Sequence, residues 1–244
     1  MALVTGAARG LGQAAAWALA EAGAEIALVD RIDLSETAAL VQARGRRSVA
    51  LSADLSGLDR ARADATVAEA VSALGRVDIL INNAGIIRRG PAATFDEGDW
   101  HATLSVNLTA AFFLSQAFAR TLLALGQPGK IVNVASMLSF QGGTLVPAYA
   151  AAKSGIAGIT RALANEWAAH GINVNAIAPG YIATDLTEAL RANPERAVPM
   201  LARIPAGRWG EPADVQGAIV FLSSDAAAYI HGAILPIDGG WLSS

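Results

Sequence analysis

Tyr149 and Lys153 are the residues whose types and spacing most directly suggest chemistry. They stand four positions apart in a segment of helical periodicity, so their side chains share one face of the helix. An ammonium beside a phenol stabilises the phenolate and lowers the pKa of the phenol toward working pH. Taken alone, such a pair is as often an exposed surface pair. If it is functional, Tyr149 is a proton carrier.

Ser136 and Asn107 could complete the same site. Ser136 follows a predicted strand, at the edge of a parallel sheet where ligands bind, and its hydroxyl could hydrogen-bond a substrate oxygen. Asn107 stands in an otherwise apolar helical segment, where an unbonded amide is costly. A structural water leading to Lys153 would satisfy it, although a single helical Asn is usually a bonded core amide. Together the four residues predict a catalytic site.

A glycine-rich segment, TGAARGLG from Thr5 to Gly12, follows the first predicted strand and opens the first predicted helix. Backbone N–H groups at such a turn can bind a dinucleotide pyrophosphate, aided by the positive end of the helix. Gly6 permits the sharp turn, Gly10 lets a phosphate approach the backbone, and Gly12 lets the helix pack on the strand. Similar turns also occur without a nucleotide.

Asp30 ends the second predicted strand, where its carboxylate could accept both ribose hydroxyls of NAD and repel the extra phosphate of NADP. The alternative is a solvated acid at a strand end. Arg9 and Arg31 blur the choice of cofactor, because either guanidinium could reach a 2′-phosphate. We predict NAD, with NADP as the less favoured cofactor.

Short aliphatic runs alternate with Ala-rich segments of helical period, which predicts a doubly wound α/β fold with a seven-stranded parallel sheet and helices on both faces. The predicted strands are Ala2–Thr5, Ile26–Asp30, Ser48–Ala53, Ile79–Ile81, Ile131–Ala135, Val174–Ile177 and Ile234–Ile237. The predicted helices are Leu11–Ala22, Ser35–Ala43, Asp59–Leu74, Trp100–Leu125, Tyr149–His170 and Asp214–Ser223. Residues 180–208 are expected to form an irregular loop that could close over a substrate. No linker is visible, so residues 1–244 are expected to form a single domain.

Composition argues against several other classes. Hydrophobic residues make up 53% of the chain and charged residues 16%, which indicates a large buried core. The formal charge is -3 without basic runs, so we expect no nucleic acid partner. Cysteine is absent and the three histidines are far apart, so we expect no metal site. The segment Leu108–Phe118 is interrupted by polar residues and no signal peptide is visible, so we expect no membrane span and a cytoplasmic protein.

These motifs, in this order and spacing, resemble the short-chain dehydrogenase/reductase family over essentially the whole chain. The matching segments are Thr5 to Gly12, Asp54-Leu55, Asn82 to Gly85, Asn107, Ser136, Tyr149 to Lys153 and Pro179-Gly180. The resemblance implies a single Rossmann-like domain that transfers hydride between a nicotinamide cofactor and a secondary alcohol. It further implies a cofactor site built from Gly6, Arg9, Gly10, Leu11, Gly12, Asp30, Asp54, Leu55, Asn83, Ala84, Gly85, Tyr149, Lys153, Pro179, Gly180, Ile182 and Thr184. In it, Asp54 and Leu55 would contact adenine, and Lys153 would grip the nicotinamide ribose.

Finer similarity points to a sugar-acid branch of this family, whose substrates are 2-dehydro-3-deoxy-D-gluconate or 2-deoxy-D-gluconate. It is carried by the segments Ile86–Arg89, Ser136–Gly143, Arg203–Gly210 and Asp238–Leu242. An aldonate carboxylate favours a guanidinium, so Arg88 or Arg89 is expected to bind it, with Gln141, Ser136 and Tyr149 near the hydroxyls. An exposed, solvated Arg pair is the simpler alternative. Gluconate 5-dehydrogenases are the second candidate class, and a nucleotide-sensing protein without turnover is the third.

Two predicted helices carry apolar side chains around more of their circumference than one sheet face requires. Examples are Phe112, Phe113, Phe118, Ile156, Ile159 and Trp167. This surplus suggests contacts between subunits. The family resemblance implies a homotetramer with two-fold axes.

Overall fold

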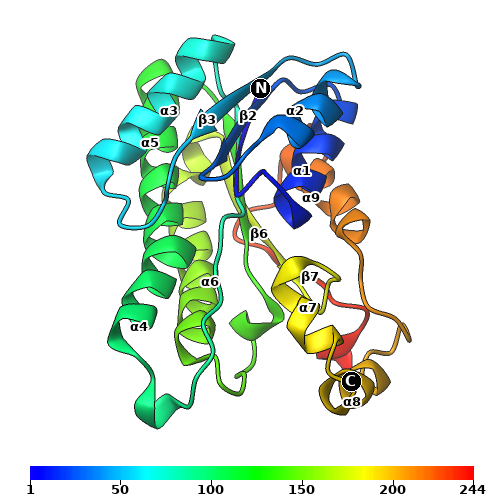
Figure 1. Cartoon of the computed structure of the whole chain (residues 1–244). Helices are drawn as coiled ribbons and strands as arrows, with labels where there is room; N and C mark the ends of the chain where they lie inside the picture. The colour runs from blue at the N-terminus through cyan, green and yellow to red at the C-terminus, as the bar shows by residue number, and fades with distance from the viewer.

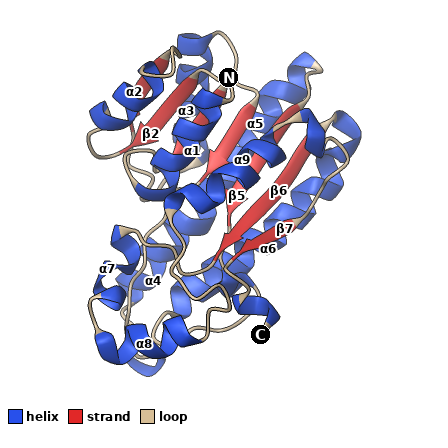
Figure 2. Cartoon of the chain, turned by 90° about the vertical axis from the view of Figure 1, so that its right-hand side faces the viewer, coloured by secondary structure: helices blue, strands red, loops and turns tan.

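Seven parallel strands form one continuous sheet, in the spatial order β3-β2-β1-β4-β5-β6-β7. The computed structural model describes all residues from Met1 to Ser244. The strands are β1 Ala2–Thr5, β2 Ile26–Asp30, β3 Ser48–Ser52, β4 Ile79–Asn82, β5 Gly129–Val134, β6 Ile172–Pro179 and β7 Ile234–Ile237. Helices cover both faces of this sheet (Figure 2). The predicted doubly wound α/β fold is therefore confirmed.

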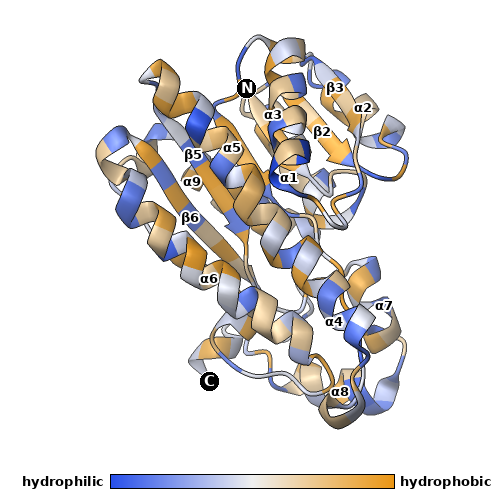
Figure 3. Ribbon diagram, turned by 90° about the vertical axis from the view of Figure 1, so that its left-hand side faces the viewer, coloured by the Kyte–Doolittle hydropathy of each residue, from blue (hydrophilic) through white to orange (hydrophobic).

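The strands are mostly apolar because both faces of the sheet are covered, and several polar residues within them, such as Asn133 and Asn175, are buried. Successive side chains of a strand point to opposite faces, so Leu3 joins one core cluster while Ala2 and Val4 join another. The first cluster lies under α3, α5 and α6, and the second under α1 and α9. Figure 3 shows apolar residues along the strands and on the helices that cover them.

Nine α-helices connect and cover the strands. They are α1 Gly10–Glu21, α2 Ser35–Gln42, α3 Arg60–Leu74, α4 Glu97–Leu104, α5 Ala110–Leu125, α6 Pro147–Trp167, α7 Asp185–Arg191, α8 Pro194–Ala202 and α9 Gln216–Ser223. Local signals fix several ends: the Asp59 side chain accepts a hydrogen bond from the backbone N–H of Arg62 at the start of α3, and Gly126 ends α5 in the left-handed conformation.

Two sequence predictions about these helices were wrong. The segment 180–208, expected to be irregular, contains α7 and α8, which lie together below the sheet at the lower right of Figure 1. The predicted helix Trp100–Leu125 begins earlier, at Glu97, and residues Ser105–Thr109 form a π-helical turn between α4 and α5. A π turn inside a helix often marks a functional position, and this one carries Asn107.

The expectation that no apolar stretch reaches the length of a membrane span was also wrong. By length and composition alone, the helical stretch Glu97–Leu125 could cross a membrane, and 44% of its apolar window is buried inside the protein. Leu114, Phe118 and Leu122 of this stretch pack into the core beside the sheet. The core therefore accounts for much of its apolar character.

The chain order of the strands reverses between β1 and β4. From β1 the chain runs outward through β2 and β3, and then returns to β4 on the other side of β1. At such a switch point the loops after two neighbouring strands lead in opposite directions and leave a crevice at the carboxyl ends of the strands. The glycine-rich segment follows β1 and Asn83 to Gly85 follow β4, so both lie at this crevice.

Candidate active site

The glycine-rich segment forms a tight loop that packs against the end of β4. Gly6 and Gly10 have positive φ angles of 63° and 57°, which favour glycine. A Cβ on Gly6 would lie 2.8 Å from the Cα of Ala84, and a Cβ on Gly12 would collide with the carbonyl oxygen of Gly6. The three glycines therefore satisfy the geometry of a loop that presents backbone N–H groups at the start of α1. This is a cradle that a dinucleotide pyrophosphate fits.

Side chains from two other elements hold this loop in place. The hydroxyl of Thr5 accepts hydrogen bonds from the backbone N–H groups of Asn83 (3.0 Å) and Ala84 (3.1 Å). The Asn83 amide donates to the carbonyl oxygens of Thr5 (2.9 Å) and Gly6 (3.0 Å). The side chain of Asn83 is thus occupied with the loop, which leaves its backbone, Ala84 and Gly85 for the expected contact with the cofactor. Thr5 was recognised only as part of the glycine-rich segment, and its role in holding the loop was not predicted, because a hydroxyl that only supports a loop has no spacing signature.

Asp30 lies beside the loop, as expected. Its carboxylate accepts hydrogen bonds from the backbone N–H groups of Ala8 (3.0 Å) and Arg31 (2.7 Å). Each carboxylate oxygen keeps further lone pairs, so ribose hydroxyls can still donate to it. Arg9 reaches across the site and pairs with Asp185 at the start of α7, with 2.6 Å between Nη1 and Oδ2.

The other expected cofactor residues follow β3 or lie between the end of β6 and the start of α7. Asp54 accepts a hydrogen bond from the backbone N–H of Ser56, which is the main reason why its pKa is lowered, and Leu55 is buried next to it. Thr184 precedes α7, and its Cγ2 lies 3.6 Å from where a Cβ on Gly10 would stand, so it faces the loop containing Leu11. Pro179 and Ile182 are buried at the end of β6. A Cβ on Gly180 would lie 2.7 Å from the Cα of Asp238, so chain packing already requires that glycine.

The four expected catalytic residues come from β5, α6 and the π-helical turn. Ser136 follows β5, and its hydroxyl accepts a hydrogen bond from the N–H of Leu138 (3.2 Å). The same hydroxyl lies close enough to Tyr149 to lower the pKa of the phenol. The Ser139 hydroxyl donates to the carbonyl oxygen of Lys153 (2.6 Å), which fixes α6 against the turn that follows β5. The Lys153 ammonium is 3% exposed and donates to the carbonyl oxygen of Val134 (2.6 Å). Ser136, Tyr149 and Lys153 therefore meet.

The expected lowering of the Tyr149 pKa was wrong for the protein without ligands. Burial raises the pKa of this phenol to about 12, although hydrogen bonding to Ser136 and the charge of Arg89 oppose the increase. Burial also lowers the pKa of Lys153 to about 8. The ammonium lies 5.5 Å from the centre of the Tyr149 ring and is directed at Val134, so desolvation outweighs its attraction for the phenolate.

Asn107 is buried at the π-helical turn with one atom unpaired. Its amide nitrogen donates to the carbonyl oxygens of Thr103 (2.8 Å) and Ile86 (2.9 Å), while Oδ1 has no partner. That oxygen would lie 2.6 Å from a Cβ on Gly85, so this glycine leaves room beside it. An unpaired buried acceptor is costly, which agrees with the expected water on the path to Lys153.

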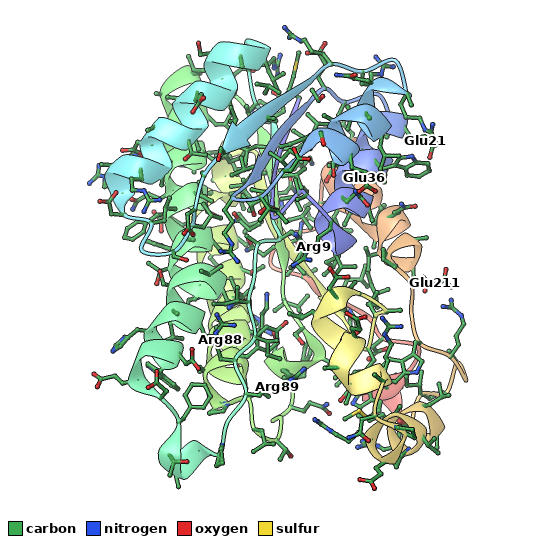
Figure 4. All side chains as sticks on the ribbon, viewed as in Figure 1. Arg9, Glu21, Glu36, Arg88, Arg89 and Glu211 are labelled. Carbon is green, nitrogen blue, oxygen red and sulfur yellow. The ribbon has the colours of Figure 1, made fainter.

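The two candidate arginines point to different places (Figure 4). Arg88 pairs with Asp99 on α4, with 3.1 Å between Nε and Oδ1. Arg89 forms no ion pair, and its charge acts on Tyr149 and Tyr181. The structure thus brings Arg89, and not Arg88, to the tyrosines. Gln141 is half-buried beyond Ser136, and its side chain makes no hydrogen bond within the chain.

An aromatic group beside this site was not predicted from the sequence. The Tyr181 ring meets Trp241 edge to face at 4.9 Å and Trp209 at 5.5 Å, and Trp241 is 4% exposed. Tyr149 and Tyr181 both pack against the same small apolar cluster, which contains Trp241 and Ile204. A cavity of about 200 Å³ lies behind Tyr181, at the ends of β6 and β7. These aromatic residues are separated along the chain, so only the fold reveals the group.

Hydride transfer to or from a nicotinamide ring needs a dinucleotide held beside a group that moves a proton. This crevice brings a dinucleotide cradle and a half-buried tyrosine to one sheet edge. The fold and the site thus define a dinucleotide-dependent dehydrogenase or reductase. A family model described as enoyl-(acyl carrier protein) reductase matches residues 6–242. The chain belongs to the short-chain dehydrogenase/reductase family.

Several members of this family are similar over their full length. The 2-dehydro-3-deoxy-D-gluconate 5-dehydrogenase of Escherichia coli strain K12 is 51% identical, over 100% of this chain and 95% of the relative. A structure from Agrobacterium tumefaciens, provisionally described as a 2-deoxy-D-gluconate 3-dehydrogenase with bound NADP, is 56% identical with a TM-score of 0.92, covering 100% and 96% of the two chains. A structure from Beutenbergia cavernae, provisionally described as an NAD(P)-dependent gluconate 5-dehydrogenase with bound NADP, is 51% identical with a TM-score of 0.94 and the same coverage.

Proposed function

We propose that this chain is an NAD(H)-linked dehydrogenase of sugar acids that acts on a secondary alcohol of 2-dehydro-3-deoxy-D-gluconate or 2-deoxy-D-gluconate. The observation that carries the proposal is the position of Arg89, an arginine without an acidic partner whose charge acts on Tyr149. A guanidinium there suits a substrate that has a carboxylate a few carbons from the reacting alcohol. The relatives named for these sugar acids support the same choice.

In the oxidative direction, we assign proton removal to Tyr149 and stabilisation of the developing carbonyl to Ser136. The nicotinamide, when bound, accepts the hydride that leaves the alcohol carbon. The Tyr149 phenolate accepts the hydroxyl proton, so one hydride and one proton leave the substrate together. The Ser136 hydroxyl donates a hydrogen bond to the oxygen that becomes the ketone. Lys153 and Asn107, through a water at the unpaired Oδ1, carry the proton toward solvent.

We propose NAD as the preferred cofactor because Asp30 stands beside the glycine loop. A carboxylate at this place accepts ribose hydroxyls and repels a 2′-phosphate. Arg9, which could otherwise attract that phosphate, is paired with Asp185. The NADP bound in the two related structures supports the opposite preference, and Arg31 is the basic residue through which it would act. The choice between NAD and NADP is therefore tested in the same experiment as the choice of substrate.

The experiment measures initial rates with 2-dehydro-3-deoxy-D-gluconate, its 5-keto partner, D-gluconate and 5-ketogluconate, each with NAD(H) and with NADP(H). We expect a selective NAD(H)-linked rate on the deoxy pair. Activity on the gluconate pair alone would favour the second candidate, a gluconate 5-dehydrogenase, which the Beutenbergia relative supports. Turnover of none of the four would refute the sugar-acid proposal.

We further propose that residues 1–244 act as one domain, that the active form is a homotetramer, and that it works in the cytoplasm. Exposed apolar side chains on several elements support assembly, among them Leu125, which is 65% exposed, and Tyr229, which is 99% exposed. Of the six residues expected at subunit contacts, Phe118, Ile156 and Trp167 are buried within the subunit. Phe112, Phe113 and Ile159 are half-buried and remain candidates for the interface.

A further inference from the structure

Three arginines near the proposed active site have no acidic partner. They are Arg89, Arg196 on α8 and Arg203 directly after α8, and none of them forms an ion pair or a side-chain hydrogen bond. Arginines close to them in sequence do form ion pairs: Arg88 pairs with Asp99 at 3.1 Å, and Arg208 pairs with Asp214 at 2.7 Å. Local sequence therefore does not explain why these three guanidiniums are left unpaired.

The three positive charges converge on one tyrosine. Burial raises the pKa of Tyr181, and the charges of Arg203, Arg196 and Arg89 all oppose that increase. Arg196 also acts on Arg89, whose pKa is lowered first by burial and then by this like charge. All three arginines are exposed, so water screens their mutual repulsion, and a bound carboxylate would supply the counter-ion that the chain itself does not provide.

Arg203 is held in position by stacking. Its guanidinium carbon lies 4.1 Å from the centre of the Trp241 ring, and Trp241 is 4% exposed and meets Tyr181 edge to face. A guanidinium that stacks through its face keeps the N–H donors at its edge free, and these donors match the two oxygens of a carboxylate. Arg203 is exposed, and its stacking on Trp241 orients the guanidinium.

The arginines come from separate segments of the chain: Arg89 follows β4, whereas Arg196 lies on α8 and Arg203 directly after it. Arg89 lies between the α4 side of the opening and the α7–α8 side (Figure 4). Leu201 of α8 and Ile87 beside Arg89 pack against the same apolar cluster as Tyr149 and Tyr181. This shared packing keeps α8 next to the segment after β4, so the charges stay close to the catalytic tyrosine.

We propose that Arg196 and Arg203 join Arg89 in a subsite that binds the carboxylate of the substrate, next to Tyr149. The proposal rests on the proposed function, because it assumes that the substrate is a sugar acid. It assigns two further residues to substrate specificity, both carried by a segment in which sequence reasoning expected no defined structure.

The test compares Arg196→Ala, Arg203→Gln and Arg203→Lys with the wild type and with Arg60→Ala, which removes an exposed charge on α3. The substrates are 2-deoxy-D-gluconate and its uncharged amide, and thermal melting with NADH binding checks the fold and the cofactor site. We expect KM for the acid to rise about tenfold to a hundredfold in the first two variants, with a smaller change in kcat. KM for the amide should change little, and Arg203→Lys should lie between the wild type and Arg203→Gln.

Two results would overturn the proposal, and they can be told apart. If the wild type oxidises the acid and both Arg196→Ala and Arg203→Gln keep the KM of Arg60→Ala, the arginine subsite is wrong while the proposed function stands. If the wild type oxidises none of the sugar acids, the proposed function fails and the subsite fails with it. Equal losses on the acid and the amide would assign the arginines a structural role and would also overturn the proposal.

Discussion

Replacing Lys153 by Met should stabilise the fold while removing activity. Burial lowers the pKa of Lys153 from its usual 10.5 to about 8, which corresponds to about 3 kcal/mol of unfavourable free energy at pH 7. Methionine has a similar shape and no charge, but it cannot donate to the carbonyl oxygen of Val134, which costs about 1 kcal/mol. We therefore expect the free energy of unfolding at pH 7 to rise by about 2 kcal/mol.

The pH dependence of this gain follows from the sign of the pKa shift. Between pH 8 and 10.5 the folded protein has released the Lys153 proton while the unfolded chain still holds it, so the stability of the wild type rises with pH across this window. The advantage of Lys153→Met should therefore be largest below pH 8 and shrink toward pH 10.5. The raised pKa of Tyr149 acts above pH 10 in both proteins and cancels from the difference to first order.

Urea unfolding followed by circular dichroism, at one fixed protein concentration, measures the difference at pH 7 and at pH 10. Lys130→Met is the matched control, because Lys130 is the only other lysine and donates to Asn173 Oδ1 at 2.9 Å from a half-buried position. This control should gain less than Lys153→Met or lose stability, because burial lowers the pKa of Lys130 by a smaller amount while the asparagine oxygen still loses its donor. Equal or lower stability of Lys153→Met at pH 7 would refute the claim that Lys153 bears a desolvation cost.

Three further outcomes are expected. Tyr149→Phe should lower kcat by at least a hundredfold and change NADH binding far less, and full activity of the variant would contradict the assignment. The oxidation rate of the wild type should rise with pH above neutrality, because the pKa of Tyr149 is raised, and a flat profile with chemistry rate-limiting would count against the same assignment. Asp30→Ser should shift the ratio of kcat/KM for NAD over NADP toward NADP by about tenfold, measured by initial rates, and an unchanged ratio would remove Asp30 from cofactor selection. Size-exclusion chromatography with light scattering should give the mass of four 24.9 kDa subunits, and a monomer mass would rule out the tetramer.

The strands and the cofactor loop could be predicted from sequence because their signals are local. Gly6, Gly10 and Gly12 follow a strand at fixed spacing, and the structure gives each of them a conformational or steric reason to be glycine. By contrast, residues 180–208 are rich in Pro, Arg and Thr, a composition that predicts an irregular loop where the structure has α7 and α8. A signal was nevertheless present, since Asn193 can cap a helix and Pro194 is favoured at its first position.

The site residues show a different limit. Spacing placed Tyr149 and Lys153 together, but it could not show how deeply both would be buried, and burial reverses the expected direction of the Tyr149 pKa. Spacing also could not show which of Arg88 and Arg89 faces the active site. Adjacent residues after a strand end point in different directions, and the sequence does not say which direction each takes. The decision depends on Asp99, which the fold brings to Arg88.

The distribution of charge in the fold explains why spacing predicted neither the direction of the Tyr149 pKa nor the choice between Arg88 and Arg89. Elsewhere charged side chains are often matched, as in the pairs Arg47–Glu25 at 2.8 Å and Arg208–Asp214 at 2.7 Å. At the carboxyl end of the sheet, Lys153 is charged and almost fully buried, and Arg89 has no carboxylate near it. A chain selected for stability alone would pair or remove Lys153, because a buried charge costs free energy in the folded state. Lys153 and Arg89 stay without a carboxylate partner at one edge of the sheet. This is the arrangement that a site requires when the cofactor and the substrate supply the negative charge.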